Sequence, residues 1–193
     1  MGSRTFDMNY RPDYNPRALF GELAEGRSCS DCAVCCTVLE VSTPELKKPA
    51  GKTCEHCTGS GCAIYEDRFP VCRTWFCLWR FIGAMPDEAR PDRSGILFGL
   101  AHPEDPPHPF AKTYIRAMAF EDEAAFETEL AQDLIAMFGQ GDLPVWISTS
   151  DSDLFLVHPA TEIVDVVLGK TKPKSRQQKK DAKAWEAGVR QHR

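Results

Sequence analysis

The sequence predicts an α+β protein in which an irregular, metal-centred, cysteine-rich segment is attached to a small antiparallel sheet with one core helix. Two observations lead to this fold class. All nine cysteines lie between Cys29 and Cys77, in a stretch with neither helical nor strand periodicity. From Ser94 onwards, short apolar segments separated by Pro, Gly and Asp surround a single long amphipathic segment. With 193 residues and a 42% hydrophobic share, the chain can bury a core without disulfide bonds.

The N-terminal part predicts one short helix and no segment that crosses a membrane. In residues 15–26, NPRALFGELAEG, Asn15 is the expected N-cap, Pro16 the first helical residue and Gly26 the residue after the end. The first twenty residues lack the apolar run of a signal peptide, and no later run is long enough to span a membrane. We therefore expect a cytoplasmic protein whose thiols are reduced or metal-bound rather than paired in disulfides. The next segment, TVLEV at 37–41, favours a strand.

The second half of the chain predicts the sheet and its helix. Strands are expected at 95–101, 111–120, 143–149 and 153–159. Between them, residues 121–138 have a helical pattern that begins with three acidic residues and stops at Gly139. One face of this helix is apolar and should lie on the sheet, and its residues are Phe126, Leu130, Leu134 and Met137.

The C-terminal segment from residue 170 carries a local charge of +7, whereas the whole chain has −5, so the rest of the protein is −12. Ser175 and Gln178 form a capping-box pattern, and a thin apolar stripe follows at Ala182, Trp185 and Val189. The pattern is compatible with a docking helix and with a solvated tail. An acidic body disfavours nucleic-acid binding, so RNA or another polyanion is expected only on this basic segment. An unknown protein partner is the other possibility for the same segment.

These elements divide the chain into four regions, with one folded domain expected over residues 13–169. The regions are an N-terminal arm and short helix (1–26), a cysteine-cluster metal-binding segment (27–86), a small α+β portion (87–169) and a basic C-terminal tail (170–193).

The spacing of the cysteines indicates metal ligands. C-x2-C pairs let two thiolates reach one metal from a single turn, and later segments then complete a site of four cysteines or of three cysteines and a histidine. This spacing joins Cys29 to Cys32, Cys32 to Cys35 and Cys54 to Cys57. All nine cysteines are candidate metal ligands: Cys29, Cys32, Cys35, Cys36, Cys54, Cys57, Cys62, Cys72 and Cys77.

The number of metal sites stays open at this point. Neighbouring side chains diverge in helices and strands, so Cys35 and Cys36 should serve different sites unless only one of them is a ligand. Two sites of four ligands would leave one thiol over, for which Cys36 or Cys54 is the expected residue. His56 could replace one cysteine in a zinc site.

Several other residues near the cysteines suit such a centre. Gly59 and Gly61 would let backbone N–H groups approach sulfur. Arg68, Arg73 and Arg80 could offset thiolate charge, although each could equally be a solvated surface residue.

The cysteine segment resembles a known bacterial family. The run Cys29-x2-Cys32-x2-Cys35-Cys36, followed by GCAIYEDRFPVCRTWFCLW, is similar to the CxxCxxCC family of zinc- or iron-chelating proteins, also called YkgJ-type cysteine cluster proteins. The match covers about residues 27–80. One residue departs from the pattern, because Phe69 stands where the family usually has proline. The residues that follow the family pattern are Cys62, Ile64, Tyr65, Arg68, Cys72, Arg73, Cys77 and Trp79.

The resemblance implies a metal-binding protein, with iron and zinc both open. A related cysteine cluster in a flagellin lysine methylase resembles an iron-sulfur segment, which favours iron. The run C-x2-C-x2-C can also supply three ligands of a cubane cluster, with a distant cysteine as the fourth. We therefore expect an Fe-S cluster, with 4Fe-4S favoured, in a structural, electron-transfer or sensing role. Structural Zn2+ in one or two sites is the alternative.

Catalysis by this chain is the less favoured class of function. The sequence contains no P-loop, no G-x-G-x-x-G after a strand and no G-x-S-x-G. The histidines His102, His108 and His158 stand among prolines and strand ends rather than as a catalytic set.

Overall fold

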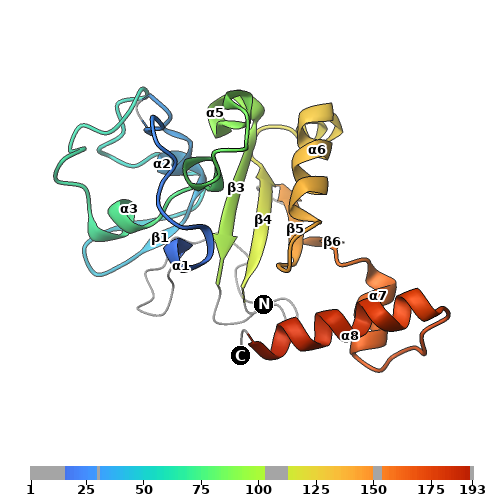
Figure 1. Cartoon of the computed structure of the whole chain (residues 1–193). Helices are drawn as coiled ribbons and strands as arrows, with labels where there is room; N and C mark the ends of the chain where they lie inside the picture. Colours follow the sequence, from blue (N-terminus) through green and yellow to red (C-terminus); the bar gives the residue numbers. More distant parts are fainter. Residues whose placement is uncertain (1–15, 30, 103–112, 150–153, 192–193) are drawn as a thin grey trace.

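The computed structural model describes residues 16–29, 31–102, 113–149 and 154–191. A four-stranded sheet lies between helix α6 on one side and the cysteine-rich lobe on the other, while two further helices lie at the far end of the molecule (Figure 1). The main sheet consists of β3 (Ile96–Ala101), β4 (Tyr114–Ala119), β5 (Val145–Thr149) and β6 (Phe155–His158). The mixed α+β class is thus confirmed.

The main sheet is mixed, so the expectation that the strands after Ser94 form an antiparallel sheet is wrong for one pair. In the order β3-β4-β5-β6, the outer pairs are antiparallel, but β4 and β5 are parallel, with Ile115 opposite Val145. The reason is the connection, because the chain crosses over through α6 (Glu129–Phe138) and returns in the same direction. Antiparallel pairing also occurs in the cysteine-rich lobe, between β1 (Val41–Ser42) and β2 (Lys47–Lys48).

Helix α6 is the core helix expected on the sheet, but it is shorter than the predicted 121–138. The segment divides into a 3-10 helix, η2 (Glu123–Glu127), and α6, because Thr128 is extended and its hydroxyl accepts a hydrogen bond from the Ala131 N–H at 3.2 Å. The predicted stop at Gly139 is correct. Leu134 and Phe138 then pack against the strands, with the rings of Phe98 and Phe138 5.5 Å apart.

The opposite face of the sheet supports the cysteine-rich lobe. Leu97, Met118 and Trp146 alternate with the residues that face α6, and they pack against Leu39 and Trp75 from the lobe. The lobe itself has only short elements. These are α2 (Val34–Val38), β1, β2, α3 (Pro70–Thr74), α4 (Leu78–Phe81), η1 (Asp87–Ala89) and α5 (Pro91–Ser94).

Two predicted elements near the N-terminus are shorter than expected. Helix α1 (Pro16–Phe20) ends at Gly21, whose φ of 77° breaks the helix well before Gly26. The expected N-cap, Asn15, lies outside the described residues. The expected strand at 37–41 is mostly absent, since α2 extends to Val38 and β1 begins only at Val41.

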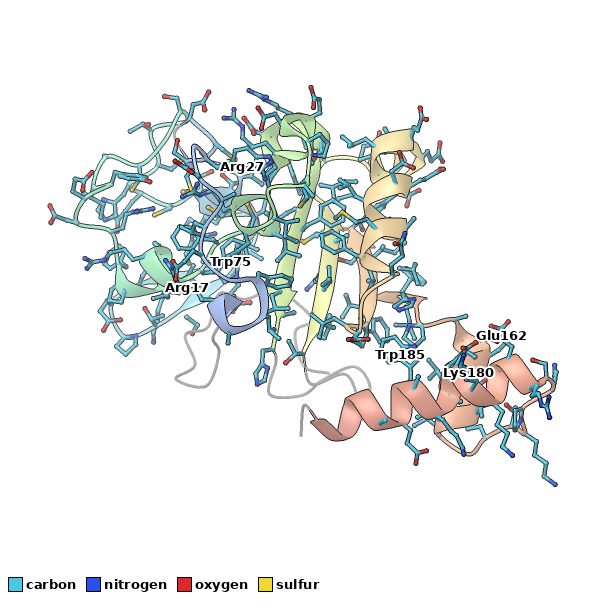
Figure 2. All side chains as sticks on the ribbon, in the orientation of Figure 1. Arg17, Arg27, Trp75, Glu162, Lys180 and Trp185 are labelled. Carbon is cyan, nitrogen blue, oxygen red and sulfur yellow. The ribbon has the colours of Figure 1, made fainter. Side chains whose placement is uncertain are left out.

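The basic C-terminal segment forms a long helix, α8 (Arg176–Gln191), which packs against α7 (Thr161–Val167). The capping pattern is correct at its start, where the Gln178 N–H donates to Ser175 Oγ at 3.0 Å. Trp185 lies on the side of α8 that faces the sheet (Figure 2), and its ring meets His158 edge-on at 5.1 Å. Among the described residues, no helix combines the length and the apolar character needed to cross a membrane.

Candidate metal centre

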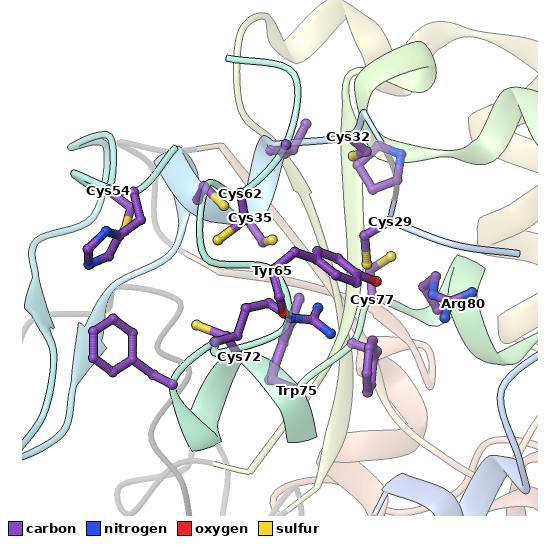
Figure 3. A pocket seen from close by; sticks show the side chains of 18 of the residues that line it. Cys29, Cys32, Cys35, Cys54, Cys62, Tyr65, Cys72, Trp75, Cys77 and Arg80 are labelled. Carbon is purple, nitrogen blue, oxygen red and sulfur yellow. Dashed lines mark hydrogen bonds between the residues drawn. The ribbon is translucent and has the colours of Figure 1, made fainter. Parts of the chain in front are cut away.

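One cavity collects almost all the thiols of the chain. It has a volume of about 90 Å³, several times the ~10–15 Å³ that one water molecule needs. Aromatic side chains including Tyr65 and Trp75 form much of its wall (Figure 3). All nine cysteines are free thiols. Eight of them line this cavity, and they are Cys29, Cys32, Cys35, Cys36, Cys54, Cys62, Cys72 and Cys77.

Short turns place the first four cysteines. The Cys32 N–H donates to the Cys29 carbonyl at 2.7 Å, which folds the first C-x2-C pair into a tight turn. Helix α2 then begins at Val34, so Cys35 and Cys36 both lie in its first turn. The spacing in the sequence therefore produces the local convergence that was expected from it.

A second segment is tied to α2 through its backbone. The Cys54 N–H donates to the Cys36 carbonyl at 2.9 Å, and the Cys57 N–H donates to the Cys54 carbonyl at 3.0 Å. Cys57 and Cys62 then pair as an isolated antiparallel bridge. The turn between them contains Gly59, with φ 85°, and positive φ is a conformation that glycine adopts without steric cost.

The last two cysteines come from the ends of short helices. Cys72 lies in α3, where its N–H donates to the Phe69 carbonyl at 2.9 Å. Cys77 is the N-cap residue of α4, where the backbone N–H of Arg80 donates to the Cys77 carbonyl at 3.0 Å.

Cys29, Cys32 and Cys77 lie together on one side of the cavity (Figure 3), and we group Cys35 with them because Cys29 and Cys77 influence its thiol; these four cysteines are the first thiol group. Burial raises the pKa of Cys77 to about 12, and the nearby charges of Cys29 and Cys32 add to the rise. The pKa of Cys35 is raised well above its ordinary value, chiefly by a thiol hydrogen bond to Cys36, and also by burial and by Cys29 and Cys77. Cys35 and Cys77 are thus each influenced by other members of this group.

The remaining thiols that line the cavity act on the pKa of Cys72. Burial raises the pKa of Cys72 to about 11, and the charges of Cys36, Cys54 and Cys62 raise it further. We call Cys36, Cys54, Cys62 and Cys72 the second thiol group. Cys57 is not among the residues that line the cavity, and its thiol forms a hydrogen bond with Cys36.

The pKa of Cys36 is lowered to about 6, mainly because the Cys35 thiol donates a hydrogen bond to it. Burial opposes this shift, while the Cys57 hydrogen bond and the charges of Lys48 and Arg68 support it. In the metal-free protein Cys36 is therefore largely a thiolate at neutral pH.

A buried lysine, which no sequence pattern marked, lines the same cavity as the second thiol group. Lys48 is only 6% exposed, and its ammonium donates to four backbone carbonyls. The acceptors are those of Thr37 at 3.1 Å, Pro49 at 3.2 Å, Lys52 at 3.0 Å and Leu39. Burial lowers the pKa of Lys48, and the thiols of Cys54, Cys36, Cys35 and Cys72 act in the opposite direction. Among the described residues, the titratable groups with the largest effect on Lys48 are thus cysteines.

The three arginines singled out in the sequence have different surroundings. Arg80 lines the cavity and is 7% exposed, and its buried Nε and Nη1 have no hydrogen-bond partner among the described residues. Arg68 also lines the cavity, with its guanidinium 3.7 Å from the centre of the Tyr65 ring. Arg73 is exposed and does not line the cavity, so for this residue the solvated alternative applies.

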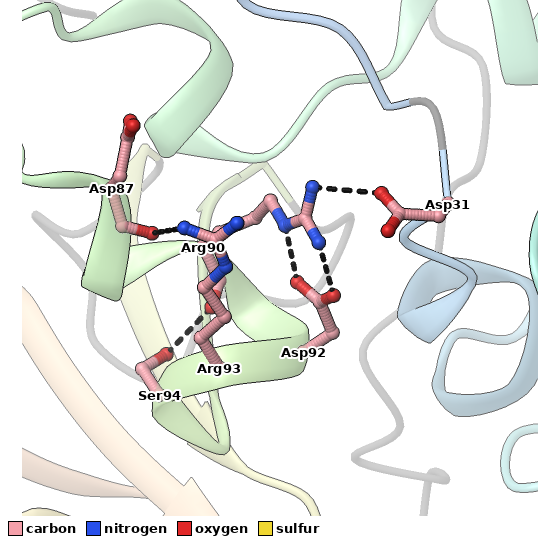
Figure 4. Close-up of polar contacts among 6 residues, drawn as sticks. All are labelled: Asp31, Asp87, Arg90, Asp92, Arg93 and Ser94. Carbon is pink, nitrogen blue, oxygen red and sulfur yellow. Dashed lines mark hydrogen bonds and ion pairs between the residues drawn. The ribbon is translucent and has the colours of Figure 1, made fainter.

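Two salt-bridged groups fix the segment that carries Cys29 and Cys32. Arg90 donates to both oxygens of Asp92 at 2.6 Å and to Asp31 Oδ1 at 2.8 Å, which ties the residue before Cys32 to α5 (Figure 4). Asp92 in turn contacts the Cys32 thiol, whose pKa is raised chiefly by burial and also by the Asp92 charge.

Arg27 holds the same segment from its other side. Its guanidinium donates to the Ile82 carbonyl at 2.8 Å and also to the carbonyls of Trp79, Gly83 and Met85. It also lies 4.6 Å from the centre of the Trp79 ring. Arg27, Arg90 and Asp92 were not singled out in the sequence, because nothing in the local pattern separates them from ordinary surface charges.

His56 lines the cavity, where its ring lies 5.7 Å from that of Phe69, and its Nε2 is 3.9 Å from Glu55 Oε1. Within residues 16–29, 31–102, 113–149 and 154–191, no set of three or more Cys, His, Asp or Glu side chains is spaced to hold a single metal ion.

Comparisons with protein-family models, with curated proteins and with solved structures find no match to this chain. The similarity of residues 27–80 to the CxxCxxCC family therefore stays a prediction from the sequence motif.

Proposed function

We propose that this protein binds an iron-sulfur cluster of the 4Fe-4S type through Cys29, Cys32, Cys35 and Cys77. The observation that carries the proposal is the first thiol group itself. Three cysteines of one C-x2-C-x2-C run line the same cavity as a distant fourth cysteine. Such a run with a remote fourth cysteine is the usual way to hold a cubane cluster.

The surroundings of these thiols suit a negatively charged centre. A cluster ligated by four thiolates is anionic, and it needs positive charge or N–H donors when it is shielded from water. Arg80 offers two buried N–H groups without partners in the described part of the chain, and it acts electrostatically on Cys77. Leaving a guanidinium in this condition is costly unless an anion occupies the cavity. The residues present therefore fit the group.

The position of the thiols supports a redox or sensing role that also braces the fold. Cys29 and Cys32 are only half-buried, so a cluster there lies near the protein surface. The lobe around them contains only helices and strands of two to five residues, and bonds to metal can supply the folding free energy that such a lobe lacks. When bound, the cluster would accept and release single electrons.

Purification without oxygen tests the proposal. The protein should be brown and contain about four iron and about four acid-labile sulfide ions per chain, as expected for one cubane cluster. Cys77→Ser should remove iron, sulfide and colour together. Cys57→Ser is the matched control, because Cys57 does not line the cavity. A colourless protein with stoichiometric zinc and no iron would replace the iron proposal with structural zinc at the same four thiols.

A further inference from the structure

We propose that Cys36, Cys54, Cys62 and Cys72 form a second, separate centre that binds one zinc ion. The inference extends the proposed metal binding from one centre to two. These residues come from four stretches of the lobe, yet all four line the same cavity as the first thiol group. The centre would join α2, α3 and the two segments between them.

The backbone already gathers these stretches. The hydrogen bond from Cys54 to the Cys36 carbonyl joins the second segment to α2, and the bridge between Cys57 and Cys62 folds that segment back on itself. Cys72 is electrostatically linked to Cys36, Cys54 and Cys62. The sulfurs do not yet have the spacing of ligands to one ion. Binding thus requires rotation about χ1, the one torsion that places a cysteine sulfur.

Lys48 is the independent observation that points to an anionic centre here. A buried ammonium is costly unless it is paired, and carbonyl acceptors satisfy its hydrogen bonds without balancing its charge. In the described part of the chain, no carboxylate forms an ion pair with Lys48, whereas Cys36, Cys54 and Cys72 of the second thiol group line the same cavity and act on it electrostatically. Arg68 adds a second positive charge near Cys36 and Cys72. Four thiolates around a zinc ion carry a net charge of about −2, which these two cations balance.

Apart from the hydrogen bond between their thiols, Cys35 and Cys36 have different neighbours, and this difference separates the two proposed centres. Adjacent residues on a helix point in directions about 100° apart. Cys35 is influenced by Cys29 and Cys77, whereas Cys36 is influenced by Cys57, Lys48 and Arg68. The cations near the two groups also differ, because Arg80 acts on Cys77 whereas Lys48 is influenced most by Cys54 and Cys36.

Cys57 is the thiol left over in this arrangement, in place of Cys36 or Cys54 as the sequence suggested. It does not line the cavity, and it donates a hydrogen bond to Cys36 instead.

Zinc suits the second thiol group better than a cluster does. The group lacks a C-x2-C-x2-C run, and its four ligands come singly from four stretches. Tetrahedral zinc with four cysteines is the common solution where an ion holds irregular segments together.

The test is metal analysis of anaerobically purified full-length protein and three matched variants, from cells supplied with both iron and zinc. Wild type should hold about one zinc per chain in addition to its iron. Cys72→Ser should lose the zinc and keep iron, sulfide and colour, whereas Cys77→Ser should lose the cluster and keep the zinc. Cys57→Ser should keep both metals. If Cys72→Ser does not fold, Cys54→Ser replaces it, with far-UV circular dichroism as the check.

Three results would overturn the inference: wild type without zinc, parallel loss of iron and zinc in Cys72→Ser, or equal zinc loss in Cys57→Ser and Cys72→Ser. Failure of the iron proposal would look different. In that case wild type would hold two zinc ions, and Cys72→Ser and Cys77→Ser would each lose one, which supports two centres while rejecting the cluster.

Discussion

The thiols of Cys35 and Cys36 share a hydrogen bond, although each residue belongs to a different thiol group. The contact raises the pKa of Cys35 and lowers that of Cys36, so neighbours in the chain have opposite protonation in the metal-free protein. Metal binding removes protons from thiols. Because Cys35 and Cys36 share a hydrogen bond, loss of a proton from one thiol on metal binding changes the pKa of the other thiol, in the other proposed centre. The following predictions examine the groups around them.

Arg80→Gln should lower the reduction potential of the proposed cluster. Removing a buried positive charge disfavours the more negative, reduced state by about 1–2 kcal/mol, or roughly 40–90 mV for a one-electron couple. A redox titration followed by visible absorption measures the shift. Arg80→Lys should retain most of the potential, and the exposed Arg73 gives the matched control Arg73→Gln. Equal potentials for Arg80→Gln and wild type would show that Arg80 does not face the centre.

Lys48→Met should destabilise the cysteine-rich lobe and weaken zinc binding. Four carbonyls lose their donor, which costs on the order of 2–4 kcal/mol in the free energy of unfolding, and the thiolates lose a counter-charge. Urea unfolding and zinc competition against a chromophoric chelator measure the two effects. Lys47→Met is the control, because Lys47 is the exposed neighbour on β2. Similar results for both variants would contradict the assigned role of Lys48.

His158 should make the protein less stable in mild acid. Burial lowers its pKa below the ordinary 6.5, with a smaller opposing effect from a hydrogen bond to the Gly141 backbone. As the pH falls below 6.5, the unfolded chain therefore binds more protons than the folded chain. The contribution of neutral His158 to the free energy of unfolding is present above pH 6.5 and is lost as the pH falls through the pKa of His158 in the folded protein. The difference in unfolding free energy between wild type and His158→Gln should shrink from pH 7.5 to pH 5.5. A constant difference would argue against this.

Removal of residues 170–193 should leave the metal content unchanged. Helix α8 contacts α7 and His158, at the far end of the molecule from the cysteine-rich lobe (Figure 1). The deletion removes the packing of α8 against α7 and should lower the melting temperature by a few degrees. A chain ending at residue 187 keeps Ala182 and Trp185 and serves as the control. Loss of iron or zinc on deletion would mean that α8 supports the centres.

The sequence predicted the strands and the core helix well, but not the direction of every strand. Apolar segments between Gly, Pro and Asp mark β3 to β6 correctly, because burial on a pleated sheet leaves a local pattern. Parallel pairing of β4 and β5 leaves no such local pattern, since it depends on the crossover through α6. Thr128 also interrupted a helix whose apolar spacing looked continuous, because its side chain caps a new first turn.

The cysteine spacing anticipated the convergence of the thiols, but not the groups that balance their charge. Lys48 lies in the segment ELKKP, which looks like a solvated turn, and only tertiary contacts bury it. Arg73 and Arg80 are equivalent by sequence, yet one is exposed and the other is buried. Burial of a single long side chain depends on neighbours that are distant along the chain, and no local pattern records them.

Anomalous X-ray diffraction from anaerobically grown crystals, measured at the iron and zinc absorption edges, tests the central claim most directly. The account predicts iron signal enclosed by the sulfurs of Cys29, Cys32, Cys35 and Cys77, and a separate zinc signal among Cys36, Cys54, Cys62 and Cys72. Zinc between Cys29 and Cys77, or a single iron signal shared by both thiol groups, would contradict it.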